Sequence, residues 1–309
     1  MEEARLRHHH HRVALMIVLV LSIHHAHCTT VETIVSSVVS YGARGDGRTD
    51  DTKALLDAWN AACSGGGASR RYGSSSYASM VLVPGGRTFV ISPVQLRGPC
   101  KSLITLQGGG VLDGRGKQWW PKSCKFDSTQ LGCYVRVYKQ SLVLHDSERV
   151  LVDGLTLVNS QQIHFSIFHS SNVTATNLIV SAARKSPNTD GVHVQGSKFV
   201  NLGTITIDTG MPASLSFFLS FPFSLCLLCL MLRIISRGRL HLHWSQHISR
   251  LHALNYVDIY VASMQGGAGL ATGISFRNVQ MDNVKNPIII DQFYCDMESS
   301  PQGCVSTRL

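Results

Sequence analysis

Charged residues are scarce in this sequence: Asp, Glu, Lys and Arg make up 15% of the chain, while hydrophobic residues make up 44%. This balance excludes an intrinsically disordered protein, which needs the opposite composition. The Lys and Arg residues are scattered, so the chain lacks the basic helix or aromatic-basic platform of a nucleic-acid-binding protein, despite a net charge of +9 and a pI near 9.2. The positive charge suits a polyanionic partner, or simply solubility.

The N-terminal region lacks an apolar run long enough for a membrane anchor. The run from Val13 to Ile23 falls short of the ~20 residues that a transmembrane helix needs. It follows three arginines and precedes the small-x-small sequence Ala26-His27-Cys28, which is typical of a signal-peptide cleavage site. We therefore predict a signal peptide over residues 1–28 and a secreted chain that meets an oxidising compartment.

Nine cysteines agree with such a compartment. Cys28 leaves with the signal peptide, and Cys226-x-x-Cys229 lies in an apolar run without the histidines that a zinc site would need. Sequence cannot choose among the pairings of the others. Local bridges within the two closely spaced pairs would leave Cys63 and Cys100 for each other. The disulfide candidates are Cys63, Cys100, Cys124, Cys133, Cys295 and Cys304.

One short pattern of apolar residues occurs four times. Two alternating apolar pairs with a small or turn-prone residue between them describe two short strands that meet at a bend. Successive copies begin at Val150, Val173 and Val200, a spacing typical of one coil of a parallel β-helix. The full set is Val150, Val152, Leu155, Leu157; Val173, Ala175, Leu178, Val180; Val200, Leu202, Ile205, Ile207; and Ile274, Phe276, Val279, Met281, with bends at Gly154, Asn177, Gly203 and Asn278.

The repeat predicts an all-β protein, a right-handed parallel β-helix whose coils stack ~4.8 Å apart and present a long outer groove. A β-sandwich also has short alternating strands, but it would not repeat one four-position pattern. Helical heptads are absent, and the one helix that we expect is Asp50–Cys63, with Asp50 or Asp51 as its N-cap. This helix would cap the open end of the solenoid with an apolar face made of Ala54, Leu55, Ala58 and Trp59.

Ordered motifs along the chain match one enzyme family. The most specific motif is Ser186-Pro-Asn-Thr-Asp-Gly191. The others are Tyr41-Gly-Ala-Arg-Gly-Asp-Gly-Arg-Thr-Asp-Asp-Thr52, Gly98-Pro-Cys100, Leu112-Asp-Gly-Arg-Gly-Lys-Gln-Trp-Trp120, Gln265-Gly-Gly-Ala-Gly269 and Asn286-Pro-Ile-Ile-Ile-Asp-Gln-Phe-Tyr-Cys-Asp296. Together they resemble the plant polygalacturonases, pectin-degrading enzymes of glycoside hydrolase family 28.

The resemblance implies an inverting hydrolase that cuts α-1,4 bonds between the galacturonic acid units of pectin, without a cofactor or metal. Inversion needs one carboxyl group to protonate the leaving oxygen and another to activate water on the opposite face. The Asn-Thr-Asp motif of the family supplies Asp190 as a catalytic carboxylate and Asn188 beside it as a substrate-binding residue. Alone, Asn-Thr-Asp-Gly is also a turn sequence. We interpret His193 as an outward or core-edge strand residue, not a catalytic one, and expect a monomer in the cell wall.

The family's other two carboxylates, which form an Asp-Asp-Cys sequence after Thr-Gly, are missing where the family has them. Thr209-Gly210 is followed by Met211–Leu230, an unrelated run rich in Phe, Ser and Leu. Such residues have pyrimidine-rich codons, as the end of an intron does. One permitted back-translation of Gly238–Ile248, shifted by one base, reads Asp-Asp-Cys-Ile-Ser-Ile-Gly-Pro-Asn-Thr-Ser. We therefore interpret residues 211–236 as a translated intron and residues 237 to about 260 as a frame-shifted exon.

The resulting map places a signal peptide at 1–28, the first part of the β-helix at 29–210, the foreign and frame-shifted segment at 211–262 and a later coil at 263–309. The family's Gly-His-Gly and Arg-x-Lys motifs are absent, and its last coils would follow Asp296, so we expect an incomplete solenoid and an inactive written chain. Alternatives are a catalytically dead pectin-binding β-helix or pseudogene product, a membrane protein that spans 211–232, and a pectate lyase, although the calcium-binding carboxylates of a lyase are not found.

Asn172-Val-Thr174 is an acceptor sequence for N-linked glycosylation. It lies at a turn before an expected strand. Because the chain carries a predicted signal peptide, we expect Asn172 to be glycosylated on secretion.

Overall fold

The computed structural model describes residues 33–65, 78–100, 102–122, 140–187, 189–209, 214–219, 246–254, 258–264, 274–278, 280–282 and 288–294. All of these residues belong to one compact unit. The predicted signal peptide lies outside them. Within these ranges, no helix is both long and apolar enough to cross a membrane.

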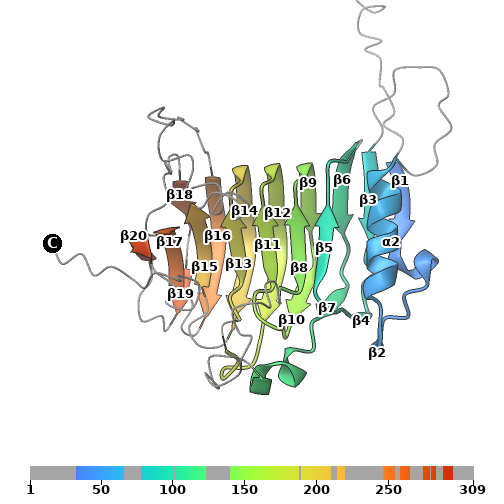
Figure 1. The fold of residues 1–309 in the computed structure, drawn as a ribbon, viewed down its shortest axis with the longest axis horizontal. Helices are drawn as coiled ribbons and strands as arrows, with labels where there is room; N and C mark the ends of the chain where they lie inside the picture. The colour runs from blue at the N-terminus through green and yellow to red at the C-terminus, as the bar shows by residue number, and fades with distance from the viewer. Residues whose placement is uncertain are drawn as a thin grey trace, which may run out of the picture. The chain divides into compact units, whose positions relative to one another are not determined.

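The described strands form two sheets in which neighbouring strands run parallel (Figure 1). The chain passes repeatedly from one sheet to the other, so neighbours within a sheet come from successive coils of a parallel β-helix. The larger sheet contains β1 (Thr33–Ser37), β2 (Asp46–Asp50), β3 (Ala78–Leu82), β4 (Thr88–Val90), β6 (Leu103–Gln107), β7 (Val111–Asp113), β9 (Glu148–Asp153), β10 (Thr156–Val158), β12 (Ser171–Ser181), β14 (Lys198–Asp208), β16 (Gln246–Leu254), β18 (Ile274–Arg277) and β19 (Gln280–Asp282). The smaller sheet contains β5 (Val94–Arg97), β8 (Leu142–His145), β11 (Phe165–Phe168), β13 (Val192–Gln195), β15 (Ser214–Leu219), β17 (Asp258–Met264) and β20 (Ile288–Tyr294). Three short 3-10 turns complete the description: η1 (Val38–Tyr41), η2 (Gly116–Gln118) and η3 (Trp120–Lys122).

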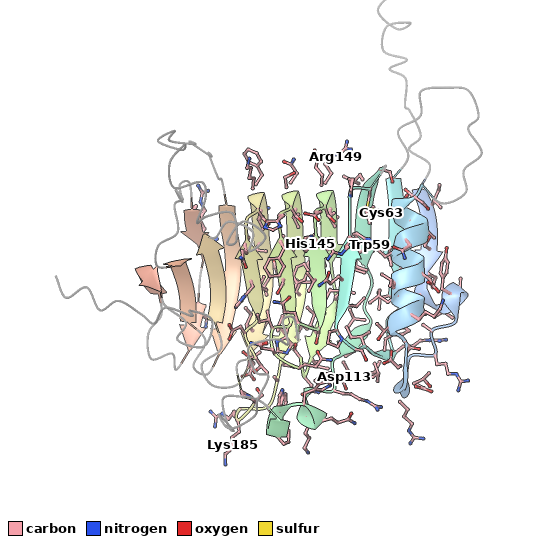
Figure 2. The ribbon with its side chains drawn as sticks, viewed as in Figure 1. Trp59, Cys63, Asp113, His145, Arg149 and Lys185 are labelled. Carbon is pink, nitrogen blue, oxygen red and sulfur yellow. A yellow bond between two sulfur atoms is a disulfide. The ribbon has the colours of Figure 1, made fainter. Side chains whose placement is uncertain are left out.

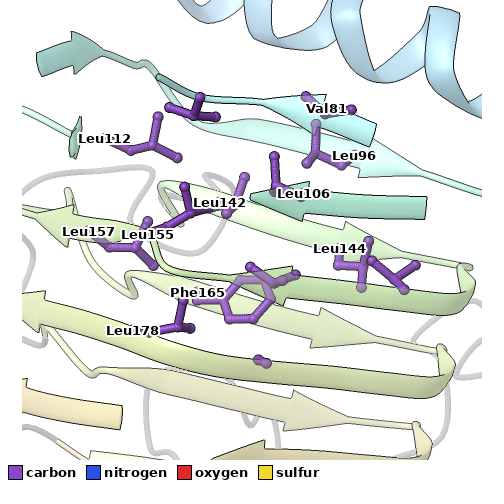
Figure 3. Packing of buried hydrophobic residues seen from close by; sticks show 14 of the residues in the cluster. Val81, Leu96, Leu106, Leu112, Leu142, Leu144, Leu155, Leu157, Phe165 and Leu178 are labelled. Carbon is purple, nitrogen blue, oxygen red and sulfur yellow. The ribbon is translucent and has the colours of Figure 1, made fainter. Parts of the chain in front are cut away.

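The repeated apolar pattern stacks in register in the larger sheet. Val173 of β12 pairs with Val150 on one side and with Val200 on the other. A second row consists of Leu157, Val180 and Ile207. All of these side chains are buried, and they form one cluster with apolar residues of the smaller sheet such as Phe165 (Figure 3). Each fully buried Val, Leu or Ile contributes roughly 1.5–3 kcal/mol, so the rows stabilise the stack of coils.

The bend between the two strands of each copy falls at the same position of the repeated pattern, just before its third apolar residue. In one copy this position differs from the one predicted from the sequence. Gly154, Asn177 and Asn278 adopt left-handed φ angles of 71°, 53° and 51°. In the third copy, however, Thr204 (φ 52°) makes the bend and Gly203 does not. The stacked ladder imposes the bend at the same place in every coil, and here it overrides the preference of a β-branched residue for negative φ.

Helix α2 (Thr52–Cys63) confirms the expected capping helix, but its N-terminus differs from the prediction. Asp51 is the N-cap residue, yet its carboxylate accepts hydrogen bonds from the amides of Arg44 (2.8 Å) and Gly45 (3.0 Å) and none from the helix. Asp50 accepts the Thr52 amide instead (2.9 Å). The apolar face predicted for the helix is buried and packs against β1, β3 and β5, the first strands of the two sheets.

A disulfide joins Cys63, the last residue of α2, to Cys100 just after β5. This bond confirms the pair that the sequence analysis reached by elimination. It ties the capping helix to the smaller sheet and closes a loop with a sequence separation of 37 residues. The other four candidates, Cys124, Cys133, Cys295 and Cys304, lie outside the described residues.

Two whole strands and the first part of a third, β17, lie within residues 211–262, the segment that the sequence analysis interpreted as foreign. β15 pairs with β13, and β16 pairs with β14. The sequence of β15, Ser-Leu-Ser-Phe-Phe-Leu, alternates between polar and apolar residues over its first four positions, as a strand can. Three apolar positions of β16 pair with apolar positions of β14: Ile248 with Leu202, Leu251 with Ile205, and Ala253 with Ile207. The fourth copy of the repeat then stacks on β16, with Ile274 opposite Gln246.

Candidate active site

Asp190 precedes β13 and is placed there by a short turn. In this turn the Ser186 amide donates to the carbonyl of Ala183 (2.8 Å), and the hydroxyls of Ser186 and Thr189 lie 2.5 Å apart. Both hydroxyl-bearing residues are buried. Asn188, the predicted substrate-binding residue, lies outside the described residues. The hydrogen-bonded turn is thus made by Ala183–Ser186, just before the Asn-Thr-Asp-Gly sequence, and the chain continues from it to the predicted catalytic carboxylate.

The carboxylate of Asp190 contacts His193. Nε2 of His193 lies 2.7 Å from Oδ2 of Asp190, and each side chain is only 11% exposed. Our interpretation of His193 as an outward or edge residue was therefore incomplete: it lies on β13, but it is buried and hydrogen-bonded to Asp190. A partner on one carboxylate oxygen fixes the rotamer of Asp190, which leaves the other oxygen oriented for chemistry.

The backbone of Asp190 is held by a second histidine that the sequence analysis did not identify. His164 donates its amide to the Asp190 carbonyl (3.0 Å), and its Nδ1 lies 3.0 Å from the same oxygen. Nε2 lies 3.3 Å from the Ser160 amide and 3.1 Å from the Ser181 carbonyl, so it can accept from the first only when unprotonated and donate to the second only when protonated. Burial lowers the pKa of His164 below its ordinary 6.5, although hydrogen bonds to the carbonyls of Asp190 and Ser181 oppose this shift.

The lowered pKa of His164 predicts a loss of stability in acid. The unfolded chain binds a proton near pH 6.5, whereas the folded chain resists it, so the contribution of neutral His164 is complete above pH 6.5 and is lost as the pH falls below it. The loss should approach about 1.4 kcal/mol per pH unit. Urea unfolding between pH 7.5 and 5 should show a flatter pH dependence for His164→Gln than for wild type. Parallel curves for the two proteins would contradict this assignment.

The turn before Asp190 also carries two cations. Arg184 and Lys185 are both exposed there, and Lys185 lies at the edge of the coils (Figure 2). No sequence motif singled them out, because isolated surface cations are common. Because they lie on the turn that precedes Asp190, these two cations could bind an anionic ligand at the candidate site.

The arrangement supplies one buried carboxylate with a histidine partner, which is half of what an inverting glycosidase needs. Asp208, the nearest acidic residue along the chain after Asp190, ends β14 in the larger sheet, while Asp190 leads into the smaller sheet. Its backbone pairs with that of Ser181. Among the described residues, the site therefore shows one carboxylate with a histidine partner, Asp190 with His193.

Comparison with known proteins identifies the family. The model of glycosyl hydrolases family 28 matches residues 93–211 and 255–307, which together exceed half of the chain. This chain belongs to glycosyl hydrolase family 28. The family 28 match skips residues 212–254, and that gap lies within the segment that the sequence analysis interpreted as intron and frame-shifted exon.

Plant members of family 28 are similar over most of the chain. A protein named probable polygalacturonase, from Arabidopsis thaliana, is 33% identical over 84% of this chain and 65% of its own length. Polygalacturonase-2 of Solanum lycopersicum is 32% identical over 85% of this chain and 63% of its own length. The chain thus spans slightly less than two thirds of the length of these curated relatives.

A solved family 28 structure shares the fold. The exopolygalacturonase of Yersinia enterocolitica superimposes with a TM-score of 0.53 at 13% sequence identity, over 86% of this chain and 62% of that one. At this identity the likeness shows the fold alone. It confirms the predicted fold class, a right-handed parallel β-helix.

Proposed function

We propose that this family 28 gene encodes a polygalacturonase-type hydrolase that is secreted to the cell wall and cleaves the α-1,4-galacturonan of pectin with inversion. The observation that carries the proposal is Asp190, the last residue of the Asn-Thr-Asp motif, which is hydrogen-bonded to His193. Arg184 and Lys185 on the same turn suit a polymer with a carboxylate on every sugar. Asn188 is the proposed substrate-binding residue, and neither metal nor cofactor enters the mechanism.

The missing carboxylates fit the smaller sheet if the shifted reading frame is translated. In the sequence Asp-Asp-Cys-Ile-Ser-Ile, one residue separates the second Asp from the alternating Ile-Ser-Ile. In the written chain, one residue likewise separates Asp190 from the alternating Val192-His193-Val194. In the place of β15, this strand would put that Asp one coil from Asp190, ~4.8 Å away at the backbone. Such crowding raises the pKa of one carboxyl group, so one acid stays protonated while another activates water.

The written chain should release no reducing ends from polygalacturonate, whereas the spliced chain should release them. The written sequence places Met211-Pro212 after Gly210, so it has only Asp190 of the three proposed carboxylates. Amplifying cDNA across codons 205–270 should reveal a transcript that encodes Thr-Gly-Asp-Asp-Cys. Both proteins are then expressed, and proton NMR of the nascent product should show the inverted anomer. A retained anomer, or hydrolysis by the written chain, would contradict the proposed mechanism.

A non-catalytic pectin-binding β-helix is the second candidate, and one observation favours it. β16 stacks in register on β14 in the written sequence, so the foreign segment is compatible with a continued larger sheet. In that case every transcript would retain the segment, and the purified written chain would bind oligogalacturonate without cleaving it. The same cDNA experiment therefore separates the two candidates.

Asn172 should carry an N-linked glycan when the chain is secreted. The residue is exposed at the start of β12 and adopts a left-handed φ of 54°, so its side chain lies at a bend on the surface. Peptide mass analysis of protein secreted from plant cells should show a glycan mass on the peptide that contains Asn172. Asn172→Gln should remove that mass. An unshifted wild-type peptide would show that the sequon is unused.

A further inference from the structure

Two histidines and an aspartate meet at an edge of the smaller sheet. His145 is the last residue of β8 and Asp146 follows it, while His169 follows the last residue of β11. The two strands are paired neighbours, with His145 opposite Phe168, so the cluster joins two successive coils. All three residues lie at the carboxyl ends of their strands, whereas Asp190 lies before the amino end of β13. The cluster is therefore separate from the candidate active site.

The geometry of this cluster is that of a set of metal ligands. Nδ1 of His145 lies 2.7 Å from Oδ2 of Asp146, and Nδ1 of His169 lies 3.9 Å from Oδ1 of the same carboxylate. One ligand atom from each residue falls within 4.8 Å of the other two. Ligands at 2.0–2.1 Å from a tetrahedral metal lie about 3.3 Å apart, so only small side-chain rotations separate the observed positions from coordination.

One ring nitrogen of each histidine in the cluster is buried without a hydrogen-bond partner among the described residues. Nδ1 of His145 is buried without a hydrogen-bond partner, although Oδ2 of Asp146 lies 2.7 Å from it. Nε2 of His169 is also buried without a hydrogen-bond partner among the described residues. Buried polar atoms are nearly always satisfied in folded proteins. A buried ring nitrogen that lies beside a carboxylate oxygen without a hydrogen bond is typical of two groups that bind the same cation.

The backbone holds the three side chains in place. Asp146 and His169 adopt left-handed φ angles of 51° and 46°, and their amides donate to the carbonyls of Phe168 (3.1 Å) and Gln195 (3.0 Å). The His169 ring lies directly against Gly196, where an added Cβ would collide with it.

One neighbouring cation opposes metal binding. Nη1 of Arg97 lies 3.7 Å from Oδ2 of Asp146, and Arg97 pairs with His145 across β5 and β8. Its side chain is 57% exposed, so a metal ion can displace this ion pair, and the competition weakens metal binding by a few-fold at most. Asp146 is itself 48% exposed, which leaves room for solvent or another ligand on a bound ion.

We propose that His145, Asp146 and His169 bind a divalent transition metal of the zinc class and thereby fasten two successive coils to each other. Two imidazoles and one carboxylate suit Zn²⁺, Ni²⁺, Cu²⁺ or Co²⁺, whereas Ca²⁺ and Mg²⁺ require oxygen ligands. Three protein ligands leave a coordination position open to solvent. The site neither depends on the proposed hydrolysis nor contributes to it.

The test compares Zn²⁺ binding by the untagged full chain with binding by the double variant His145→Asn/His169→Asn after treatment with a chelator. The chain has 15 histidines, so the informative quantity is the difference between the two proteins. Calorimetry should show one more Zn²⁺ bound by wild type. Zn²⁺ should also raise the Tm of wild type by mass action and raise that of the variant less. Co²⁺ should give a visible absorption band that the variant lacks.

Arg97→Gln provides a matched variant with an effect of opposite sign. Removing this cation should tighten Zn²⁺ binding severalfold, because Arg97 no longer competes for Asp146. Equal Zn²⁺ stoichiometry and equal Tm shifts in wild type and the double variant would overturn the proposal. So would unchanged affinity in Arg97→Gln, or Ca²⁺ binding at the site as tight as Zn²⁺ binding.

Discussion

Replacing Asp190 by asparagine in the spliced enzyme should lower kcat on polygalacturonate by about 10²- to 10⁴-fold, the usual contribution of a positioned acid or base. Asparagine has the same size, and its oxygen can still accept a hydrogen bond from His193, so the fold and the turn should persist. It cannot exchange a proton with the substrate or with water. KM should change little, because the variant keeps the groups that bind oligogalacturonate.

Two further variants give this prediction its controls. Asp208→Asn, at the end of β14 in the larger sheet, should leave kcat within about twofold of the spliced enzyme. His193→Gln should lower kcat and shift the pH profile while KM stays nearly constant, because His193 acts through Asp190. Near-normal turnover of Asp190→Asn would remove Asp190 from the mechanism. A large loss in Asp208→Asn would instead assign that carboxylate a catalytic role.

Trp59→Ala should destabilise the protein by about 3–5 kcal/mol, the range typical of a large buried aromatic side chain. Trp59 is fully buried in α2, and its indole N–H donates to the carbonyl oxygen of Arg97 at 2.9 Å (Figure 2). The substitution would leave a cavity between the capping helix and the first coils and would leave that carbonyl without its partner. The free energy of unfolding in urea measures the loss.

Trp59→Phe separates packing from hydrogen bonding. Phenylalanine keeps most of the buried ring but cannot donate to Arg97, so it should cost only about 1–2 kcal/mol. If Trp59→Ala unfolded with nearly the same midpoint as wild type, the helix would not belong to the cooperative unit of the β-helix.

The coils could be predicted from the sequence because each one repeats a short local pattern. Val150, Val173 and Val200 begin three copies, and the structure places them opposite one another. Burial along the axis requires an apolar residue at the same place in every coil, so the period is visible in the chain itself. β16 was missed for a related reason: Gln246 occupies the first apolar position and interrupts the pattern.

The conformations of Asp51 and Thr204 were beyond prediction, because Asp51 is bonded by a loop that folds back onto it and Thr204 follows the bend of the stacked coils. Asp is a favoured N-cap residue, but the carboxylate of Asp51 accepts hydrogen bonds from amides of the preceding loop and none from the helix. Thr204 makes a bend that sequence preference assigns to Gly203. In both places tertiary context outweighs a local preference worth about 1 kcal/mol.

The sequence by itself determined the coil, the capping helix and the family motif that contains Asp190, because these depend on periodic or contiguous residues. The Cys63–Cys100 bond was one of several pairings that the sequence left open, and the structure selected it. Only the tertiary structure decided that His193 contacts Asp190 and that His145 and Asp146 meet His169 from the next coil. The backbone of a β-helix follows a repeat that sequence displays. The contacts between polar side chains depend instead on the register between coils, on the turns that carry these residues and on their burial. None of these can be predicted from a repeated pattern in the sequence.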